Sequence, residues 1–503
     1  MIFLLATAPF KKSECGIINV KNWGAKGDGK TDDTKAIQKA INAAPENTLT
    51  TIYFPEGIYL LSSYITTKNY LENYFLRIHS NIQFNGEGPS TKILLGNHLF
   101  DKKDTSANAH LFYGLYINNT HFSSLVIDMN GSKNLAPEAV IKNECAIFIN
   151  HGNNITLKNV TIKNNAGRNM LIIVGEGRNI TVEKSTFLNG GQYVGNNVTN
   201  KYQPDFSFIY CEWDSAKIIN NHIEQQNIDI ALNAVCGGIE LHGSYSYAAN
   251  NEIIGCNPGI YITSSWHSME KTTVENNNFF DCLRGISFWV NHPMNNISIK
   301  DNFIRLTHSR TWKPYTVNGI ETPNGNTLQY DFSHANADIV NNLIITGNNI
   351  VVAENANNND RTAGMVLHSI HNTNISNNTI TGMNFGGVII QGSKSGSEKV
   401  EISKNKFIDF KTNYDTISPA AYIVVFDSYI LTASDAPGVK QIIIKQNNFI
   451  RNSLLKNKKP STKKSGEFFS SFTALPEYMR KEIQFEDNYF SDKTEISKFI
   501  PTK

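Results

Sequence analysis

A short repeat dominates this sequence after about residue 80 and continues almost to its end. Each copy contains a stretch of alternating apolar residues, a polar turn, a second such stretch, and then Asn-Asn or a close variant. Counted between asparagines, Asn221 to Asn251 is 30 residues, Asn251 to Asn278 is 27 and Asn278 to Asn302 is 24. Repeats of this length built from short strands are typical of a solenoid. The apolar residues recur at every second position, which excludes helical repeats.

The repeat predicts an all-β fold, a single-stranded right-handed parallel β-helix. In such a solenoid, strands of successive coils lie about 4.8 Å apart in parallel ladders, and apolar side chains alternate into a narrow core. The asparagine of each repeat is expected at a tight corner, where it tolerates the left-handed conformation and stacks on the asparagine of the next coil. Cys256 and Cys282 each stand four residues before the Ile of a Gly-Ile strand start. We therefore expect both thiols to be interior packing residues.

Composition narrows the possible functions. The 503 residues include 46 Lys and Arg against 44 Asp and Glu, which gives a formal net charge of +2. This balance argues against a nucleic-acid-binding protein, which usually carries a basic stripe. No stretch approaches the roughly 20 apolar residues of a membrane span. The six cysteines include no Cys-x-x-Cys pair, and the acidic residues show no calcium-loop spacing, so we expect neither a metal nor a cofactor.

The N-terminal segment has the features of a cap on the solenoid. The run NVKNWGAKGDGKTDDT (19–34) contains turn glycines and ends in helix-capping residues, and an apolar pattern of helical spacing follows at residues 36–41. We expect Asp32 and Asp33 to be structural, with both capping this helix. The expected organisation is a tail or signal-peptide remnant at 1–16, a cap at 17–60, and one continuous β-helix with loop insertions at 61–503.

The segment VKNWGAKGDGKTDDTKAIQKAI, followed by FPEGIY, resembles the N-terminal signature of the pectate-lyase-like superfamily. That superfamily has the parallel β-helix fold and includes relatives of glycoside hydrolase family 28 and many phage tailspike depolymerases. The resemblance implies that the short helix covers the exposed end of the solenoid and prevents edge-to-edge aggregation. It also implies a polysaccharide partner, a monomer or homotrimer, and either a secreted, cell-surface or periplasmic bacterial protein or a phage virion tail protein.

The resemblance identifies a fold and carries over no catalytic residue. Motifs of the family 28 hydrolases such as Gly-His-Gly are not present in full, and the nearest approach is Leu241-His242-Gly243. Function must therefore be argued from a site in this chain.

Aligning the coils on their asparagine pairs predicts one outward-facing cluster of acids. The strand at 237–244 aligns with that at 207–214 at an offset of 30 residues. With Ile239 and Leu241 in the core, the alternation of a strand turns the residues between them outward. The predicted catalytic cluster is Glu212, Asp214, Glu240 and His242. Tyr210, Tyr261 and Trp289 flank it on the same face, and Arg284 and His267 are further candidates for substrate contacts.

Crowded carboxylates are what glycoside hydrolysis requires. Diagonal neighbours such as Glu212 and Glu240 would be separated by roughly 8 Å at the backbone. Mutual repulsion keeps one of two such groups protonated, so that one acid protonates the leaving oxygen and the other activates water. Outward-facing strand residues of any solenoid are also polar, so an ordinary surface with a Glu240–His242 pair is the structural alternative.

Two other functions remain open at this stage. A lyase acting on uronate chains would use His242, Tyr210 or Tyr261 as the base, and Arg284 or a metal ion to neutralise the substrate carboxyl. A non-catalytic glycan-binding or tailspike protein would use the same face only to hold its glycan. Longer corners at 190–205, 307–337 and 409–419 are expected to wall a groove, and the basic stretch at 454–467 is expected to be an exposed loop.

Overall fold

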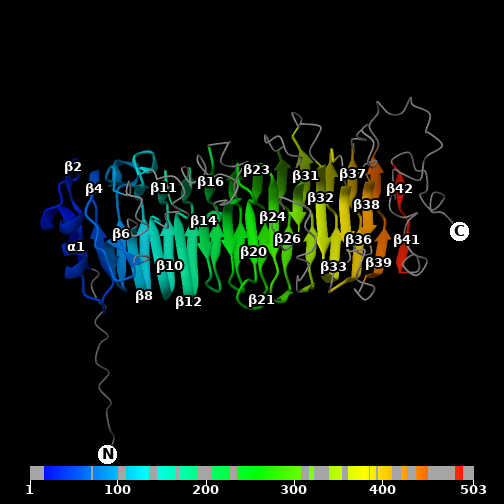
Figure 1. Ribbon diagram of the computed structural model, residues 1–503, viewed down its shortest axis with the longest axis horizontal. Coiled ribbons are helices and arrows are strands. Elements are labelled where there is room, and N and C mark those ends of the chain that lie inside the picture. The colour runs from blue at the N-terminus through cyan, green and yellow to red at the C-terminus, as the bar shows by residue number, and fades with distance from the viewer. Residues whose placement is uncertain are drawn as a thin grey trace, which may run out of the picture.

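The chain forms a right-handed parallel β-helix, as the repeat predicts (Figure 1). Its strands lie in three faces, which we call face 1, face 2 and face 3, and the solenoid runs from the N-terminal helix α1 to β42. The computed structural model describes residues 16–69, 72–99, 109–134, 144–165, 167, 169–190, 205–226, 235–307, 316–321, 339–353, 361–383, 386–391, 395–409, 421–426, 438–450 and 482–490.

Face 1 carries the candidate site. Its strands are β5 (Tyr74–Ile78), the first parts of β8 (His110–Ser123), β10 (Ile147–Lys158) and β12 (Leu171–Glu183), then β14 (Asp205–Cys211), β17 (Val235–Leu241), β20 (Ile260–Thr263), β24 (Arg284–Trp289), β28 (Thr316–Glu321), β32 (Arg361–His368), β35 (Gly386–Gln391) and β38 (Ala421–Phe426).

Face 2 continues from face 1 because β8, β10 and β12 bend from one face into the other. Its remaining strands are β1 (Gly16–Asn19), β3 (Thr50–Tyr53), β6 (Ile82–Asn85), β15 (Lys217–Ile219), β18 (Tyr247–Ala249), β22 (Thr273–Glu275), β26 (Ser298–Lys300), β30 (Ile344–Thr346), β33 (Ile370–Ser376), β36 (Ser397–Ser403), β39 (Val439–Lys445) and β41 (Ile483–Glu486). Short strands at the corner between these faces are β21 (Met269–Glu270), β25 (Met294–Asn295) and β29 (Val340–Asn341).

Face 3 is a separate parallel sheet. Its strands are β2 (Asp28–Asp32), β4 (Gly57–Leu61), β7 (Thr91–Leu95), β9 (Val126–Asp128), β11 (Thr161–Lys163), β13 (Thr186–Leu188), β16 (His222–Glu224), β19 (Glu252–Ile254), β23 (Asn278–Cys282), β27 (Phe303–Leu306), β31 (Asn349–Val352), β34 (Thr379–Thr381), β37 (Lys406–Ile408), β40 (Asn448–Ile450) and β42 (Tyr489–Phe490). Single 3-10 turns lie at η1 (Val20–Trp23), η3 (Gly88–Ser90) and η4 (Gly131–Lys133).

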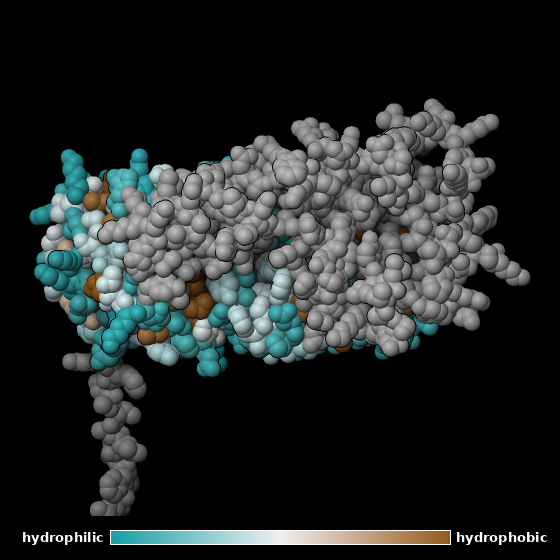
Figure 2. Space-filling model, viewed as in Figure 1, coloured by the Kyte–Doolittle hydropathy of each residue, from teal (hydrophilic) through white to brown (hydrophobic). Residues whose placement is uncertain are grey.

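Helix α1 (Thr34–Ala43) covers the first coil, as the resemblance implied (Figure 1). Its apolar residues Ile37, Ala40 and Ile41 are fully buried. The Gln38 side chain pairs with the backbone of Arg77 in β5, donating to its oxygen at 3.0 Å and accepting from its nitrogen at 2.8 Å. The helix therefore takes the place of a preceding face 1 strand, and the visible surface of this end is largely hydrophilic (Figure 2).

The two adjacent acids of the cap have different roles. Asp32 accepts a hydrogen bond from the Thr34 backbone at 3.1 Å, as expected for a residue at the start of a helix. Asp33 occupies the N-cap position, but the expectation that its side chain caps the helix is wrong, because its carboxylate accepts from the backbone nitrogens of Lys26 and Gly27 at 2.6 and 3.0 Å. Burial raises the pKa of Asp33. Both acids are structural, since they hold the turns around α1.

The two asparagines of a pair have different structural roles, one in a turn and the other in a buried ladder. The first residue of the pair, such as Asn220, Asn250 or Asn276, has a positive φ of 54–58°. The second is buried and donates its side-chain amide to the Oδ1 of the next asparagine at 2.9–3.0 Å. The ladder comprises Asn221, Asn251, Asn277, Asn302, Asn348, Asn378, Asn405, Asn447 and Asn488. Asn277 is therefore the ladder residue, and the choice of Asn278 from the sequence is wrong by one position.

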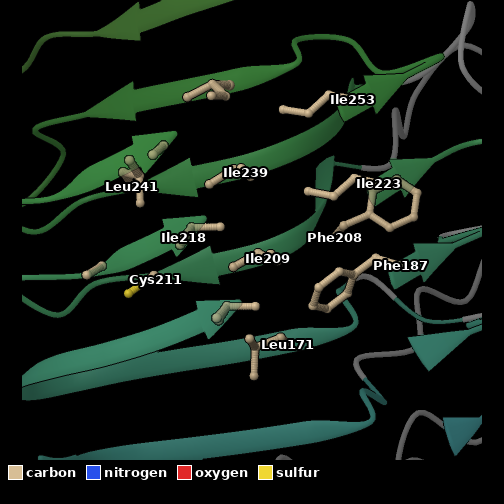
Figure 3. Close-up of a cluster of buried hydrophobic side chains, with 14 of the residues drawn as sticks. Leu171, Phe187, Phe208, Ile209, Cys211, Ile218, Ile223, Ile239, Leu241 and Ile253 are labelled. Carbon is tan, nitrogen blue, oxygen red and sulfur yellow. The ribbon is translucent and has the colours of Figure 1, made fainter. Parts of the chain in front are cut away.

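The core is a continuous column filled from all three faces. Figure 3 shows Ile209 and Ile239 from face 1, Ile218 from face 2 and Ile223 from face 3 pointing into the same interior, and all four are fully buried. The core also includes Cys256 and Cys282, which confirms their interior assignment. Burial raises the pKa of Cys282 to about 12, so its thiol stays protonated.

A column of glycines runs through the later coils of face 1. It consists of Gly238, Gly259, Gly285, Gly319 and Gly364. A Cβ atom added at Gly285 would lie 2.6 Å from the backbone oxygen of Gly319 and 2.7 Å from the Ile304 Cγ2 atom. The Gly-Ile repeat therefore reflects close stacking of backbone on backbone between coils.

Replacing a glycine of this column should destabilise the solenoid. We expect Gly285→Ala to lower the free energy of unfolding by about 1–3 kcal/mol, because the added methyl group overlaps a fixed backbone oxygen. Gly16→Ala is the matched control, since its added Cβ would meet only Thr50 at 3.9–4.0 Å. Urea denaturation of both variants measures the effect, and an equal loss in both would contradict this explanation.

Several expectations lie outside the described residues. These are the tail at 1–15, most of the three long corners, and the basic stretch at 454–467. Of the described helices, none is long and apolar enough to cross a membrane.

Candidate active site

The face 1 strands stack in the register that the sequence predicts. Tyr210 of β14 lies opposite Glu240 of β17, which lies opposite Tyr261 of β20. The same row continues to Ser287 of β24 and Glu321 of β28. One row along the axis of the solenoid therefore carries two aromatic and three polar side chains.

Glu240 is held by two donors. The Ser207 hydroxyl donates to its Oε2 at 2.7 Å, and the His242 Nε2 lies 3.0 Å from its Oε1. His242 is buried, and its Nδ1 has no hydrogen-bond partner among the described residues. A protonated Nδ1 would leave a buried N–H unsatisfied, so we assign the single proton to Nε2. Glu240 then accepts two hydrogen bonds, one from Ser207 and one from His242.

Glu212 has a different set of partners. The Tyr210 hydroxyl donates to its Oε1 at 3.0 Å, and the backbone nitrogen of Gly175 donates to its Oε2 at 2.8 Å. The Gly175 N–H is available because β12 contains a bulge there, with two residues opposite His151 in β10. Gly175 has a φ of +72°, which glycine adopts without strain. A local irregularity of the sheet thus provides a donor for a carboxylate on a neighbouring coil.

Tyr210 and His242 connect the two carboxylates. Their ring centroids lie 4.7 Å apart, and each ring contacts one of the two acids. The Trp266 indole lies close to the Tyr210 hydroxyl. Burial, followed by the charges of Glu212 and Glu240, raises the pKa of Tyr210, so its hydroxyl stays protonated. The result is one connected group in which a neutral phenol and a buried imidazole separate two acids.

Asp214 lies beside this group and stabilises the adjoining corner between face 1 and face 2. Its Oδ1 accepts a hydrogen bond from the Ser244 backbone nitrogen at 2.7 Å, where the chain turns from face 1 to face 2. Of the four residues predicted as a catalytic cluster, hydrogen bonds and ring contact connect Glu212, Glu240 and His242 through Tyr210.

Arg284 forms a second polar group further along face 1. Its guanidinium donates to Glu321 at 3.2 Å and to the Asn257 side chain at 2.8 Å. Ser287 donates to the same Glu321 oxygen at 2.8 Å, and Glu321 is only 1% exposed. The predicted substrate contact Arg284 is therefore part of a nearly buried ion pair.

The other predicted binding residues lie around the same face. Tyr261 is half-buried and stands between Glu240 and Ser287 in the row. Trp289 is half-buried, opposite Thr263. His267 is exposed in the segment between β20 and β21.

Four residues that the structure places here were not predicted from the sequence: Gly175, Ser207, Trp266 and Glu321. One of them had a detectable signal. Gly319-Ile320-Glu321 repeats Gly238-Ile239-Glu240, so the same alignment would have placed Glu321 on the outer row. Gly175 and Trp266 had no such signal, because their roles depend on a bulge and on a contact between coils.

The arrangement can support proton transfer between two acids and a bound ligand. Two carboxylates on one outer face lie on adjacent coils, one with a basic partner and the other with a phenolic partner. No group of three or more His, Cys, Asp and Glu side chains suited to a metal ion occurs among the residues that the structure describes.

Comparison with curated proteins finds partial matches. The chain is 32% identical over 192 residues to plasmin and fibronectin-binding protein A of Streptococcus pneumoniae, covering 35% of this chain and 25% of that protein. It is 61% identical over 44 residues to alginate lyase 7 of Azotobacter vinelandii, covering 9% of this chain and 5% of that protein. The matched segments thus span a quarter or less of these relatives.

Solved structures and family models cover more of the chain. A mutant tailspike protein of E. coli bacteriophage HK620, in complex with a pentasaccharide, aligns with a TM-score of 0.64 at 14% identity. The alignment covers 94% of this chain and 80% of the tailspike chain, and it shows a common fold. The model of the family described as rhamnogalacturonase A/epimerase, pectate lyase-like, matches residues 17–287, which is more than half of the chain. The chain belongs to this pectate-lyase-like family.

Proposed function

We propose that this protein hydrolyses a polysaccharide on face 1, with Glu212 and Glu240 as the acid and base. The observation that carries the proposal is the connected group of Glu212, Tyr210, His242 and Glu240 on the outer face of adjacent coils. A diagonal pair on neighbouring strands is separated by roughly 7–8 Å. Inverting glycosidases hold the two carboxyl groups about 6.5–9.5 Å apart to place a water between them, and on this backbone spacing the side-chain rotamers set that separation.

The hydrogen bonds support different roles for the two acids. Glu240 faces the Nε2–H of His242 and the hydroxyl of Ser207, which stabilise a carboxylate able to activate water. Glu212 accepts hydrogen bonds from the Tyr210 hydroxyl and from the Gly175 backbone N–H. A phenol can donate to a carboxylate or accept from a carboxylic acid, so this contact tolerates Glu212 in its protonated form. We therefore assign Glu212 as the general acid and Glu240 as the general base.

The geometry supports elimination less well. A lyase needs a base with a free proton-accepting atom, and burial raises the pKa of the Tyr210 hydroxyl while the Nε2 of His242 is turned to Glu240. It also needs a cation for the uronate carboxyl, and Arg284 already pairs with the buried Glu321. Elimination remains the second candidate reaction because one relative is named alginate lyase 7.

A polysaccharide panel tests the proposal. We would incubate the protein with laminarin, xylan, polygalacturonate, alginate and a bacterial O-antigen polysaccharide, and follow reducing ends together with the ultraviolet absorbance of new carbon–carbon double bonds. Reducing ends without absorbance are the expected result. Both signals together would establish a lyase, whereas binding to one glycan without either signal would favour a non-catalytic glycan-binding protein.

Location and assembly follow from the same proposal. A polysaccharide substrate places the protein outside the cell, either secreted, on a bacterial surface or in a phage tail. The oligomeric state is a monomer or a homotrimer, which light scattering of the purified full chain distinguishes.

A further inference from the structure

A continuous strip of side chains runs along the solenoid axis through Glu212. We call it the axial strip, and its members are Tyr116, His151, Gly175, Glu212, Tyr210 and Trp266. They come from the coils of β8, β10, β12, β14 and β20, and neighbouring members lie close to each other through ring packing, hydrogen bonds or close backbone approach. Only its middle is polar, and its two ends are exposed aromatic rings.

The N-terminal end of the axial strip is Tyr116, whose side chain is 67% exposed. Its ring centroid lies 4.7 Å from that of His151 on the next coil, with 35° between the ring planes. His151 in turn lies against Gly175, since a Cβ at that glycine would fall 2.6 Å from the imidazole. The Gly175 N–H donates to Glu212. Tyr116 thus stands three coils before Glu212, or about 14 Å along the axis.

The C-terminal end of the axial strip is Trp266, in the segment between β20 and β21. Its side chain is 69% exposed, although its indole lies close to the Tyr210 hydroxyl. The ring therefore lies beside the acids while most of its surface faces solvent. β20 lies two coils after β14, so Trp266 approaches Glu212 from the side opposite to Tyr116.

Both rings suit the apolar face of a pyranose. Tyrosine and tryptophan provide a large, rigid contact surface at low cost in conformational entropy. A ring on each side of the acids would hold sugar units on both sides of the bond to be cleaved. An enzyme that removes units from a chain end needs contacts chiefly on one side.

We propose that Tyr116 and Trp266 are sugar-stacking subsites on opposite sides of Glu212, so that a linear polysaccharide lies along the solenoid axis and is cleaved internally. This inference rests on the proposed function, because it concerns the substrate of the same site. It adds the direction of the bound chain, two residues that position it, and the mode of cleavage.

Product sizes and kinetics of variants test the inference. On the polysaccharide of the panel that is cleaved, early products of the unmodified protein should be a broad series of oligosaccharides with a rapid fall in viscosity. Tyr116→Ala and Trp266→Ala should each raise KM about 3- to 10-fold and change kcat little, because they remove binding away from the reacting bond. Each should also shift the oligosaccharide size distribution, and Trp266→Phe should restore much of the affinity.

Matched controls separate these effects from general loss of an exposed ring. Trp23 lies on the cap and is 43% exposed, and Tyr489 lies on face 3 and is 42% exposed. Trp23→Ala and Tyr489→Ala should leave KM and products unchanged. Products of one size from the start, or unchanged KM in both strip variants, would overturn the inference while leaving hydrolysis intact. If no substrate is cleaved, affinity electrophoresis in the same polysaccharides decides, because weakened binding in both strip variants supports the subsites and unchanged or absent binding refutes them.

Discussion

Glu240→Gln is expected to lower kcat by about 10²- to 10⁴-fold on the cleaved polysaccharide. Full progress curves separate this loss of kcat from an effect of incomplete substrate saturation. The amide keeps the shape of the side chain and can still meet Ser207 and His242, but it cannot take a proton from water. Reducing-end assays of the purified variant measure the loss. Glu212→Gln should cause a loss of similar size, which a substrate with a better leaving group partly relieves because that group needs less protonation.

A matched substitution on another face is the control for this result. Glu252 of β19 belongs to the same coil as Glu240 but lies on face 3, where it accepts a hydrogen bond from His222 at 2.7 Å. Glu252→Gln should retain full activity, and all three variants should unfold at nearly the same urea concentration. Activity of Glu240→Gln within twofold of the unmodified protein would refute the assignment of Glu240 as the base.

Asn277→Ala is expected to destabilise the protein by about 3–6 kcal/mol. The Asn277 oxygen accepts from both the backbone and the side chain of Asn251, and its amide donates to Asn302 and to the Ala248 oxygen. Removing the side chain leaves several buried polar groups without partners, and each costs about 1–3 kcal/mol. Urea denaturation, with calorimetry to check cooperativity along the solenoid, measures the loss.

The neighbouring residue provides an unusually close control. Asn278 is the next residue in the same sequence motif, but it is exposed and starts β23. Asn278→Ala should change stability by no more than about 0.5 kcal/mol. Equal effects in the two variants would mean that the ladder contributes little and that the asparagines serve mainly the turn.

Much of the fold could be predicted from the sequence because a parallel β-helix is periodic. Strand alternation places Ile239 and Leu241 in the core and Glu240 outside, and in-register stacking carries that assignment from coil to coil. The cap helix and the Gly-Ile strand starts depend on equally local chemistry. Which asparagine of a pair is buried was not predictable in this way, because a shift of one residue exchanges the turn and the ladder.

The candidate site, like the fold, was predictable only where strand periodicity decides the position of a residue. By itself, the sequence determined that Tyr210, Glu212, Glu240 and Tyr261 share one outward face, because backbone periodicity alone fixes that placement. Only the tertiary structure decided which of these side chains meet. The bulge at Gly175, the use of Asp214 at a corner and the contact between Trp266 and Tyr210 all depend on side-chain rotamers and on how the chain turns between faces. Those depend on packing between coils, which the spacing of residues along the chain does not encode.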